Sequence, residues 1–464
     1  MLQYFEKQQR LFPKRVWGKF RKLKWAAMII TLGIYYLAPF IRWDRGPTAP
    51  DQAILIDLQN ARAYWFWIEI WPQEVYYLTG ILILSAIGLF FVTSLFGRVW
   101  CGYFCPQTVW TDLYVWVERI FQGDRNARKK LHEGPWTWDK IRKIVATHLV
   151  WILIAWCTAG SFVLYFNDAP TLVRSFFELN VSPTVLWFIG SLTFSTYLMA
   201  GFAREQVCTY MCPYARFQSA MFDKDTLIIG YDEERGEKRG KHKKGTSWEG
   251  RGHCIDCSLC VQVCPMGIDI REGLQMECIA CGLCVDACDG VMEKVDLPKG
   301  LIRYDTENHM QAKVKGGDER FKFIRPRTIY YTIVIAIVSG IMLTALLNRS
   351  PLDITVLHDR NPLFVQLSSG SIRNGYVLKI QNKTHEHRTY QLTLNGIENA
   401  LIDVKAAGDT NADNLYVPAD AVGTYHIYVS SDIEPSAPRD IVFTLEDNEV
   451  SANYESIFIT RREK

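Results

Sequence analysis

Five stretches of this 464-residue chain are apolar and long enough to cross a lipid bilayer. A membrane-spanning helix needs about 20 residues with few or no charges. The predicted spans are Trp25–Ile41, Leu78–Phe96, Val145–Phe166, Thr184–Phe202 and Thr328–Leu347. Buried helices of a soluble enzyme are the alternative, but lipid-like runs that recur five times favour a membrane bundle. We expect the first run to be retained as an anchor, because its basic flank is long and no small-residue cleavage site follows.

Lys and Arg are unevenly distributed between the predicted spans, and this bias predicts an orientation. The N-terminal flank, the loop after the second span and residues 203–327 are rich in Lys and Arg, whereas the loops after the first and third spans have few. We therefore expect a multi-pass protein of the bacterial inner membrane. Its N-terminus and its clustered cysteines would be cytoplasmic, and its C-terminal domain periplasmic. The content of 15 Trp, 22 Tyr and 24 Phe suits the two membrane–water interfaces.

Twelve of the thirteen cysteines fall in four tight groups, which in a chain of this size favours metal binding over disulfides. Two groups repeat the run C-x2-C-x2-C-x3-C. In bacterial two-cluster ferredoxins the last cysteine of each run binds the cluster of the other run. The spacing therefore predicts two [4Fe–4S] clusters. The ligands expected for one cluster are Cys254, Cys257, Cys260 and Cys288. Those expected for the other are Cys278, Cys281, Cys284 and Cys264.

Zinc is the alternative for these two runs, but zinc sites rarely repeat a run that ends on a three-residue spacing. Pro265 follows the first run, as is usual in ferredoxins, whereas Asp289 follows the second. Since proline is not a ligand, we expect Asp289 to change the local turn and the potential of its cluster but not cluster binding.

The remaining two groups share the pattern Cys-x-Tyr-x-Cys-Pro, at 101–106 and 208–213. Each follows a predicted span that ends on the cytoplasmic side, so a helical hairpin and a motif form an internal repeat. In a helix, cysteines four residues apart share one face, and thiolates are soft metal ligands. We expect a metal site with four thiols, and buried cysteines in helix packing are the alternative. The thiols are those of Cys101, Cys105, Cys208 and Cys212.

Other cofactors and nucleic acid find little support in the sequence. Residues 229–253 are hydrophilic and basic, and a solvated linker is favoured there over a nucleic-acid or lipid-head-group surface. Gly240 and Gly245 have the spacing of a phosphate-binding loop, but Thr246 stands where its lysine must be. The chain contains no Cys-x-x-Cys-His for haem and no Gly-x-Gly-x-x-Gly for a dinucleotide.

After the fifth span the sequence changes to short β-rich segments separated by turns. They include Tyr376–Ile380, Tyr390–Leu394, Thr424–Val429 and Ile441–Leu445, with turns at Asn395-Gly396 and Glu434-Pro435-Ser436. This pattern predicts a small antiparallel β-sandwich of immunoglobulin-like size without a disulfide. His385-Glu386-His387 is interpreted as a polar turn, with metal binding as the less favoured alternative.

The residues 101–111, together with Glu118-Arg119 and Gly123-Asp124-Arg125, resemble the accessory protein of cbb3-type cytochrome c oxidase, the CcoG/FixG/RdxA family. Trp71-Pro72-Gln73, the run 264–270 and the β-rich tail fit as well, so the resemblance covers nearly the whole chain. It implies reduction of Cu(II) to Cu(I) during copper delivery, with the oxidase and its copper-delivery factors as partners. It also implies an immunoglobulin-like external domain. The plan is more distantly similar to membrane ferredoxins that draw electrons from quinol.

The predicted organisation has five parts. They are a helical membrane region with both motifs (1–228), a charged linker (229–253), a cytoplasmic 2[4Fe–4S] ferredoxin domain (254–327), a fifth membrane helix (328–348) and a periplasmic immunoglobulin-like β domain (349–464). The function expected is a membrane electron-transfer protein, a cupric reductase with clusters as relay, copper at the paired thiols and the tail as a docking module. Its electron donor is unknown. The alternatives are a quinol-oxidising ferredoxin and a non-catalytic assembly scaffold.

Overall fold

The computed structural model describes residues 10–242, 247–314, 321–397, 399–405, 411–412, 414–432, 438–447 and 450–460. The chain divides into two compact units. One comprises Met1–Trp43 and Gln52–Met342, and the other comprises Asp44–Asp51 and Leu343–Lys464.

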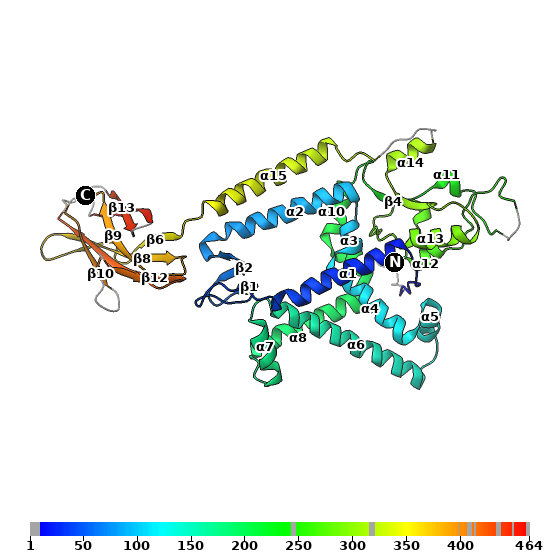
Figure 1. Cartoon of the computed structure of the whole chain (residues 1–464), viewed down its shortest axis with the longest axis horizontal. Helices are drawn as coiled ribbons and strands as arrows, with labels where there is room; N and C mark the ends of the chain where they lie inside the picture. The colour runs from blue at the N-terminus through cyan, green and yellow to red at the C-terminus, as the bar shows by residue number, and fades with distance from the viewer. Residues whose placement is uncertain are drawn as a thin grey trace, which may run out of the picture. The chain divides into compact units, whose positions relative to one another are not determined.

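Among the described residues, five helical stretches are long and apolar enough to cross a membrane. They are Lys19–Phe40, Pro72–Phe96, Trp138–Val163, Pro183–Met211 and Pro326–Leu347. The main helices in these stretches are α1 (Lys19–Leu37), α2 (Tyr76–Phe96), α6 (Trp138–Val163), α8 (Pro183–Leu198) and α15 (Pro326–Leu347) (Figure 1). Each of the five predicted spans overlaps one of them, so this part of the prediction is confirmed.

Shorter elements connect these helices. Those of the first half are η1 (Ala38–Phe40), β1 (Ile54–Asp57), β2 (Arg62–Trp65), β3 (Ile68–Ile70), η2 (Pro72–Glu74), α3 (Val99–Tyr103), α4 (Pro106–Gln122) and α5 (Arg125–Glu133). Those of the second half are α7 (Ala169–Phe177), η3 (Met199–Ala203), α9 (Arg204–Gln206), η4 (Val207–Met211) and α10 (Pro213–Met221). β1, β2 and β3 form a small antiparallel sheet.

A buried ion-pair network joins α4 to α5 and α9. The carboxylate of Glu118, which is 1% exposed, lies 2.7 Å from Arg204 Nη2, 2.7 Å from Arg128 Nη1 and 3.2 Å from Arg10 Nη2. Burial favours the neutral acid, but the three guanidinium groups outweigh it and hold the pKa of Glu118 below its usual range. Removal of this carboxylate would leave buried guanidinium groups without a counter-charge, which is strongly destabilising.

Residues 228–314, which we call the ferredoxin domain, contain two short helices that carry cysteines and a two-stranded sheet. The elements are β4 (Ile228–Tyr231), α11 (Glu233–Gly236), α12 (Leu259–Val263), η5 (Ile270–Glu272), α13 (Leu283–Lys294), β5 (Ile302–Asp305) and α14 (Glu307–Val314). β4 pairs with β5, and Ile229 and Tyr231 are buried in the domain core. This corrects the predicted linker at its start, because its first residues are apolar and form a strand.

The ferredoxin domain is joined to the start of α1. The carboxylate of Asp286 on α13 accepts the backbone N–H groups of Phe20 at 3.1 Å and Arg21 at 2.7 Å. An acidic side chain at a helix N-terminus satisfies free amides and complements the helix dipole. Gly18 is needed beside it, since a Cβ at this position would meet the Asp286 carboxyl group at 2.3 Å. The cap of α1 therefore comes from the ferredoxin domain.

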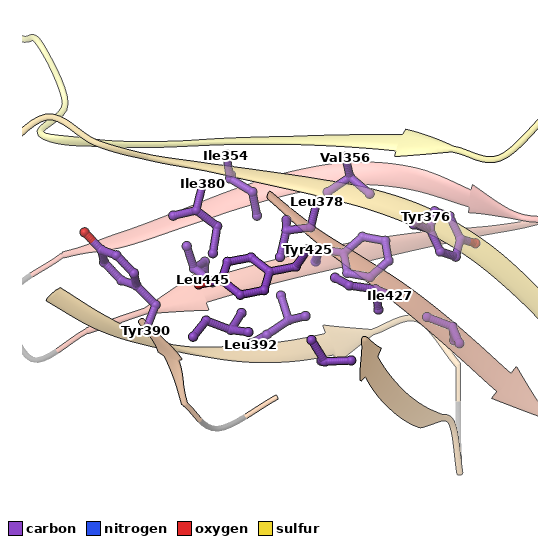
Figure 2. Packing of buried hydrophobic residues seen from close by; sticks show 14 of the residues in the cluster. Ile354, Val356, Tyr376, Leu378, Ile380, Tyr390, Leu392, Tyr425, Ile427 and Leu445 are labelled. Carbon is purple, nitrogen blue, oxygen red and sulfur yellow. The ribbon is translucent and has the colours of Figure 1, made fainter. Parts of the chain in front are cut away.

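The C-terminal unit is a β-sandwich. One sheet has the order β10-β12-β8-β6 with β7 paired to β8, and the other has the order β11-β9-β13-β14. The strands are β6 (Leu352–His358), β7 (Val365–Gln366), β8 (Ile372–Asn382), β9 (Arg388–Asn395), β10 (Leu401–Lys405), β11 (Leu415–Val417), β12 (Ala421–Ser431), β13 (Arg439–Glu446) and β14 (Ser451–Phe458). Alternate residues such as Tyr376, Leu378 and Ile380 point into the core between the sheets (Figure 2). All four predicted β segments lie in strands.

The turn residues predicted for this unit have different outcomes. Gly396 follows β9 with a φ of +105°, which a glycine adopts without strain. The turn at 434–436 lies outside the described residues. His385 Nδ1 lies 2.8 Å from Asp420 Oδ2, and His387 Nδ1 accepts the Ala419 N–H at 3.2 Å. Both histidines thus have partners within the sandwich, which fits the polar-turn interpretation.

Candidate functional site

Two cavities lined by cysteines lie inside the ferredoxin domain. The cysteines lining the first are Cys254, Cys257, Cys260 and Cys288. Those lining the second are Cys264, Cys278, Cys281 and Cys284, and Cys260 reaches its edge. Each cavity thus gathers the trio of one run and the last cysteine of the other.

The backbone of the two cysteine runs follows the same path. Asp256 and Ser258 in the first run have φ of 50° and 53°, and Ala280 and Gly282 in the second have 50° and 73°. Residues other than glycine adopt this left-handed conformation only at a cost, so the surrounding fold imposes it. These paired left-handed positions bend each loop tightly before α12 and α13 begin, and so bring three cysteines of a run to one cavity.

The chemistry of the thiols fits iron–sulfur clusters. Burial raises the pKa of Cys260 and Cys278 to about 11, and that of Cys264 and Cys288 to about 12. Buried thiols of this kind ionise at neutral pH only when a cation offsets the cost, and iron supplies that charge. Eight sulfur ligands in two sets of four are what two cubane clusters require.

The two cysteine helices end differently, and the residue after the last cysteine explains why. α12 is short and ends at Val263, and Cys264 is extended, since Pro265 cannot donate to a helix and disfavours helical backbone before it. α13 continues through Cys288 and Asp289 to Lys294. The Asp289 carboxylate accepts the Gly300 N–H at 2.9 Å. The predicted change of the local turn is therefore a longer helix.

The Cys-x-Tyr-x-Cys-Pro motifs share one backbone pattern. The N–H of Cys105 donates to Trp100 O at 2.9 Å, and that of Cys212 donates to Val207 O at 2.8 Å, five residues back in each case. Each second cysteine has extended backbone, and the proline after it opens the next helix. The first cysteine of each motif is helical and the second is extended because a proline follows it. The condition of one continuous helix through both cysteines is therefore not met.

The two motifs interlock. Gln218 on α10, fully buried, donates from Nε2 to Cys101 Sγ at 3.4 Å. In the other direction, Gln107 on α4 donates to Met199 O at 2.9 Å and to Arg204 O at 3.1 Å. Each amide follows one motif and contacts the neighbourhood of the other. The internal repeat therefore folds into one assembly.

This interlocking brings the four thiols of the motifs into electrostatic range of one another. Cys101 interacts with Cys105 and Cys212, and Cys208 interacts with all three of the others. Burial, as the largest effect, raises the pKa of Cys101 to about 11. Among the described residues, no three His, Cys, Asp or Glu side chains converge closely enough to hold a single ion as they stand.

The first motif lies directly against the loop that lines the second cavity. Gly102 faces this loop so closely that a Cβ there would meet Ile279 O at 2.7 Å and Ala280 O at 3.0 Å. Tyr103, 3% exposed, donates its hydroxyl to Cys281 O at 3.0 Å. The ferredoxin domain and the thiol motif are therefore in backbone contact here.

The second motif differs at both of these positions. Thr209 stands in place of the glycine, and its hydroxyl donates to Glu205 O at 2.9 Å. Tyr210 is 62% exposed, whereas Tyr103 is buried. A small cavity lined by Cys208, Met266 and Ile279 lies between this motif and the second cysteine cavity, which Met266 and Ile279 also line.

Sequence reasoning did not single out Gly102, Tyr103, Gln107 or Gln218. The motif pattern contained one usable signal, since glycine and threonine differ at an otherwise similar position of the repeat. The two glutamines gave none, because their partners are remote in the sequence.

Several known families and proteins are similar to this chain. A family described as a 4Fe-4S dicluster domain matches residues 203–307, and one described as a 4Fe-4S binding domain matches residues 78–124. The IG-like fold at the C-terminal of FixG matches residues 342–461. The nitrogen fixation protein FixG of Rhizobium meliloti is 46% identical over 92% of this chain and 87% of that protein. Protein RdxB of Cereibacter sphaeroides is 48% identical over 92% of this chain and 89% of its own length. Protein RdxA of the same organism is 45% identical over 94% of this chain and 93% of its own length.

Proposed function

The chain belongs to the FixG/RdxA family of iron–sulfur membrane proteins, and from this we propose that it passes single electrons to copper held by its paired thiol motifs. The reaction is Cu(II) plus one electron to give Cu(I), with the electron supplied by a donor outside this chain. Copper is the substrate, and the cuprous product would serve the assembly of a cbb3-type cytochrome c oxidase through its copper-delivery factors.

The observation that carries the proposal is the contact of the first motif with the second cysteine cavity. Electron transfer falls steeply with distance, and Gly102 allows the motif to approach the loop of Ile279 to Cys281 at backbone contact. A bound iron–sulfur cluster takes up and releases one electron at a time, which matches a one-electron acceptor. The Tyr103 hydroxyl holds the carbonyl of Cys281 and so fixes the separation between the two sites.

The thiols supply the preference for the reduced product. Sulfur ligands favour Cu(I), and a site that binds Cu(I) more tightly than Cu(II) makes copper easier to reduce. We expect copper binding to draw Cys101, Cys105, Cys208 and Cys212 closer together than they stand without it. In this proposal the motifs and the ferredoxin domain lie on the cytoplasmic side, and the β-sandwich is a periplasmic docking module.

The decisive experiment compares wild type with the variant in which all four motif cysteines are changed to serine. Under anaerobic conditions we expect the variant to keep its iron but to lose tight Cu(I) binding and cupric reduction. Cys157→Ser is the matched control, since Cys157 is the exposed cysteine outside the four groups. Equal Cu(I) affinity in the variant and wild type would end the thiol-site proposal. If the variant instead lost only the reduction of its clusters by quinol, a quinol-oxidising carrier would be favoured.

A further inference from the structure

A cavity of about 210 Å³ lies beside the first turns of α1, and its lining is rich in arginine and tryptophan. The side chains that matter are Arg15, Arg21, Arg119, Trp17, Trp25 and Trp116. None of them lies in a cysteine run or motif, although Arg119 also lines the small cavity beside Cys208. Two arginines lie over tryptophan rings. The Cζ atom of Arg15 is 4.4 Å from the ring centroid of Trp17, and that of Arg21 is 5.0 Å from the ring centroid of Trp25.

Three arginines line the cavity, and one of them is paired with an acidic side chain. Arg21 is paired with Asp112, with both oxygens at 2.9 Å. Arg119 reaches only backbone carbonyls, of Pro13 at 3.2 Å and Lys14 at 3.5 Å, and its buried Nε has no hydrogen-bond partner among the described residues. Burial and the neighbouring Arg128 and Arg21 lower the pKa of Arg119 to about 10, because they outweigh Asp112 and Asp124, which favour its charged form. An anion in the cavity would therefore stabilise this guanidinium.

The rim of the cavity is apolar and lies at the end of a membrane helix. Trp17 is 61% exposed, Trp116 is 41% exposed and Ile120, one turn after Trp116 on α4, is 56% exposed. Arg21 and Trp25 lie in the first two turns of the candidate span that begins at Lys19. Tryptophan beside arginine at a helix end is typical of the depth where phospholipid head groups lie.

We propose that this cavity binds the phosphate of an anionic glycerophospholipid. The guanidinium groups of Arg119 and Arg15 would bind the phosphate oxygens, for which the planar fork of donors is well suited. The exposed rings of Trp17 and Trp116 would cover the glycerol and the first carbons of the acyl chains. Basic pockets between membrane helices bind anionic head groups in this way. Inorganic phosphate has the same anionic group but no apolar part that could contact the tryptophan rings of the rim.

The test uses the full-length protein in a mild detergent, with phosphatidylglycerol as the anionic lipid. Native mass spectrometry and thermal unfolding are measured with added phosphatidylglycerol, with phosphatidylcholine and with inorganic phosphate. For wild type we expect bound phosphatidylglycerol and a raised melting temperature, and neither effect with the other two. In Arg119→Gln the affinity for phosphatidylglycerol should fall at least about tenfold, because a charge-assisted hydrogen bond is lost.

Two further variants keep the test decisive. Arg15→Gln removes an exposed arginine of the cavity and leaves the contacts of Arg119 with backbone carbonyls in place. It should also lower the affinity for phosphatidylglycerol. Arg142→Gln, at an exposed arginine near the start of α6, should bind like wild type. Iron content reports that each variant is folded.

Equal binding of phosphatidylcholine would reduce the site to ordinary lipid contact, and equal stabilisation by inorganic phosphate would make it a free-phosphate site. Either result overturns the proposal.

Discussion

Cys264 ends the first cysteine run but lines the cavity of the second, with Cys278 and Cys284. If the fourth ligands cross in this way, Cys264→Ser should damage the cluster of the other run. We expect iron to fall from about eight towards about four per chain, as one of two cubanes is lost. Mössbauer and EPR spectra should retain the signal of the cluster bound by Cys254 and its trio. Loss of that signal instead would show that each run binds its own cluster.

At Gly102 the first motif lies directly against the loop of the ferredoxin domain that lines the second cavity. A methyl group there would overlap the carbonyl oxygens of Ile279 and Ala280. Gly102→Ala should therefore lower the free energy of unfolding by about 1–3 kcal/mol and alter the EPR signal of the neighbouring cluster. Gly290→Ala on α13 is the matched control, because a Cβ there meets nothing within 4 Å. Equal effects of both substitutions would mean that the close contact is unimportant.

At this scale the sequence predicted which cysteines line each cavity better than it predicted the surroundings of those cysteines. The spacing of the two runs, with the crossed fourth cysteine typical of bacterial ferredoxins, was sufficient for this. The hydrogen bond between Tyr103 and Cys281 joins residues 178 positions apart, and that of Gln218 with Cys101 joins residues 117 apart. Such contacts depend on how the elements pack against one another, and a local sequence pattern does not contain this information.

Among the elements, α4 is joined to α5 and α9 by the carboxylate of Glu118. Glu118→Gln would leave Arg204, Arg128 and Arg10 around an uncharged amide, and we expect a loss of about 3–5 kcal/mol of stability at neutral pH. Glu133→Gln on α5 is the control, since this exposed glutamate pairs with the exposed Lys129. It should cost less than about 1 kcal/mol.

The same carboxylate predicts a pH dependence. Because the pKa of Glu118 is lowered in the folded protein, its contribution is complete above the pKa of an unfolded glutamate, about 4.3. It is lost as the pH falls through the lower folded value. Melting temperatures of wild type and Glu118→Gln should therefore differ most at neutral pH and converge in acid. A difference that stays constant down to pH 3 would contradict the ion-pair assignment.

Helices and strands differed in how well the sequence predicted them. The membrane helices and the four β segments have strong periodic or continuous apolar patterns, and all of them were predicted. Strand β4 was missed because its four residues precede a long basic stretch whose charge dominated the interpretation. Its partner β5 lies beyond both cysteine runs, so the pairing has no local signal.

For the whole molecule, the orientation in the membrane is the prediction with the widest consequences. The distribution of Lys and Arg predicts that the β-sandwich is periplasmic and the ferredoxin domain cytoplasmic. Alkaline phosphatase fused after Lys464 should then be active, and a fusion after Gly240 should be inactive. Enzyme activity in whole cells, corrected for the amount of each fusion, provides the measurement. The reverse pattern would overturn the orientation and the cytoplasmic location of the thiol site.

The cap that Asp286 places on α1 has a consequence for how the protein is made. The acidic residue is synthesised 265 positions after Arg21, a delay of roughly 13 to 50 seconds at ordinary translation rates of 5–20 residues per second. We expect the first helix to lack this cap until the segment that carries Asp286 has been made and has folded. If that segment needs its iron–sulfur clusters to fold, a cell short of iron should contain more chains with an uncapped first helix, and we expect such chains to be degraded faster.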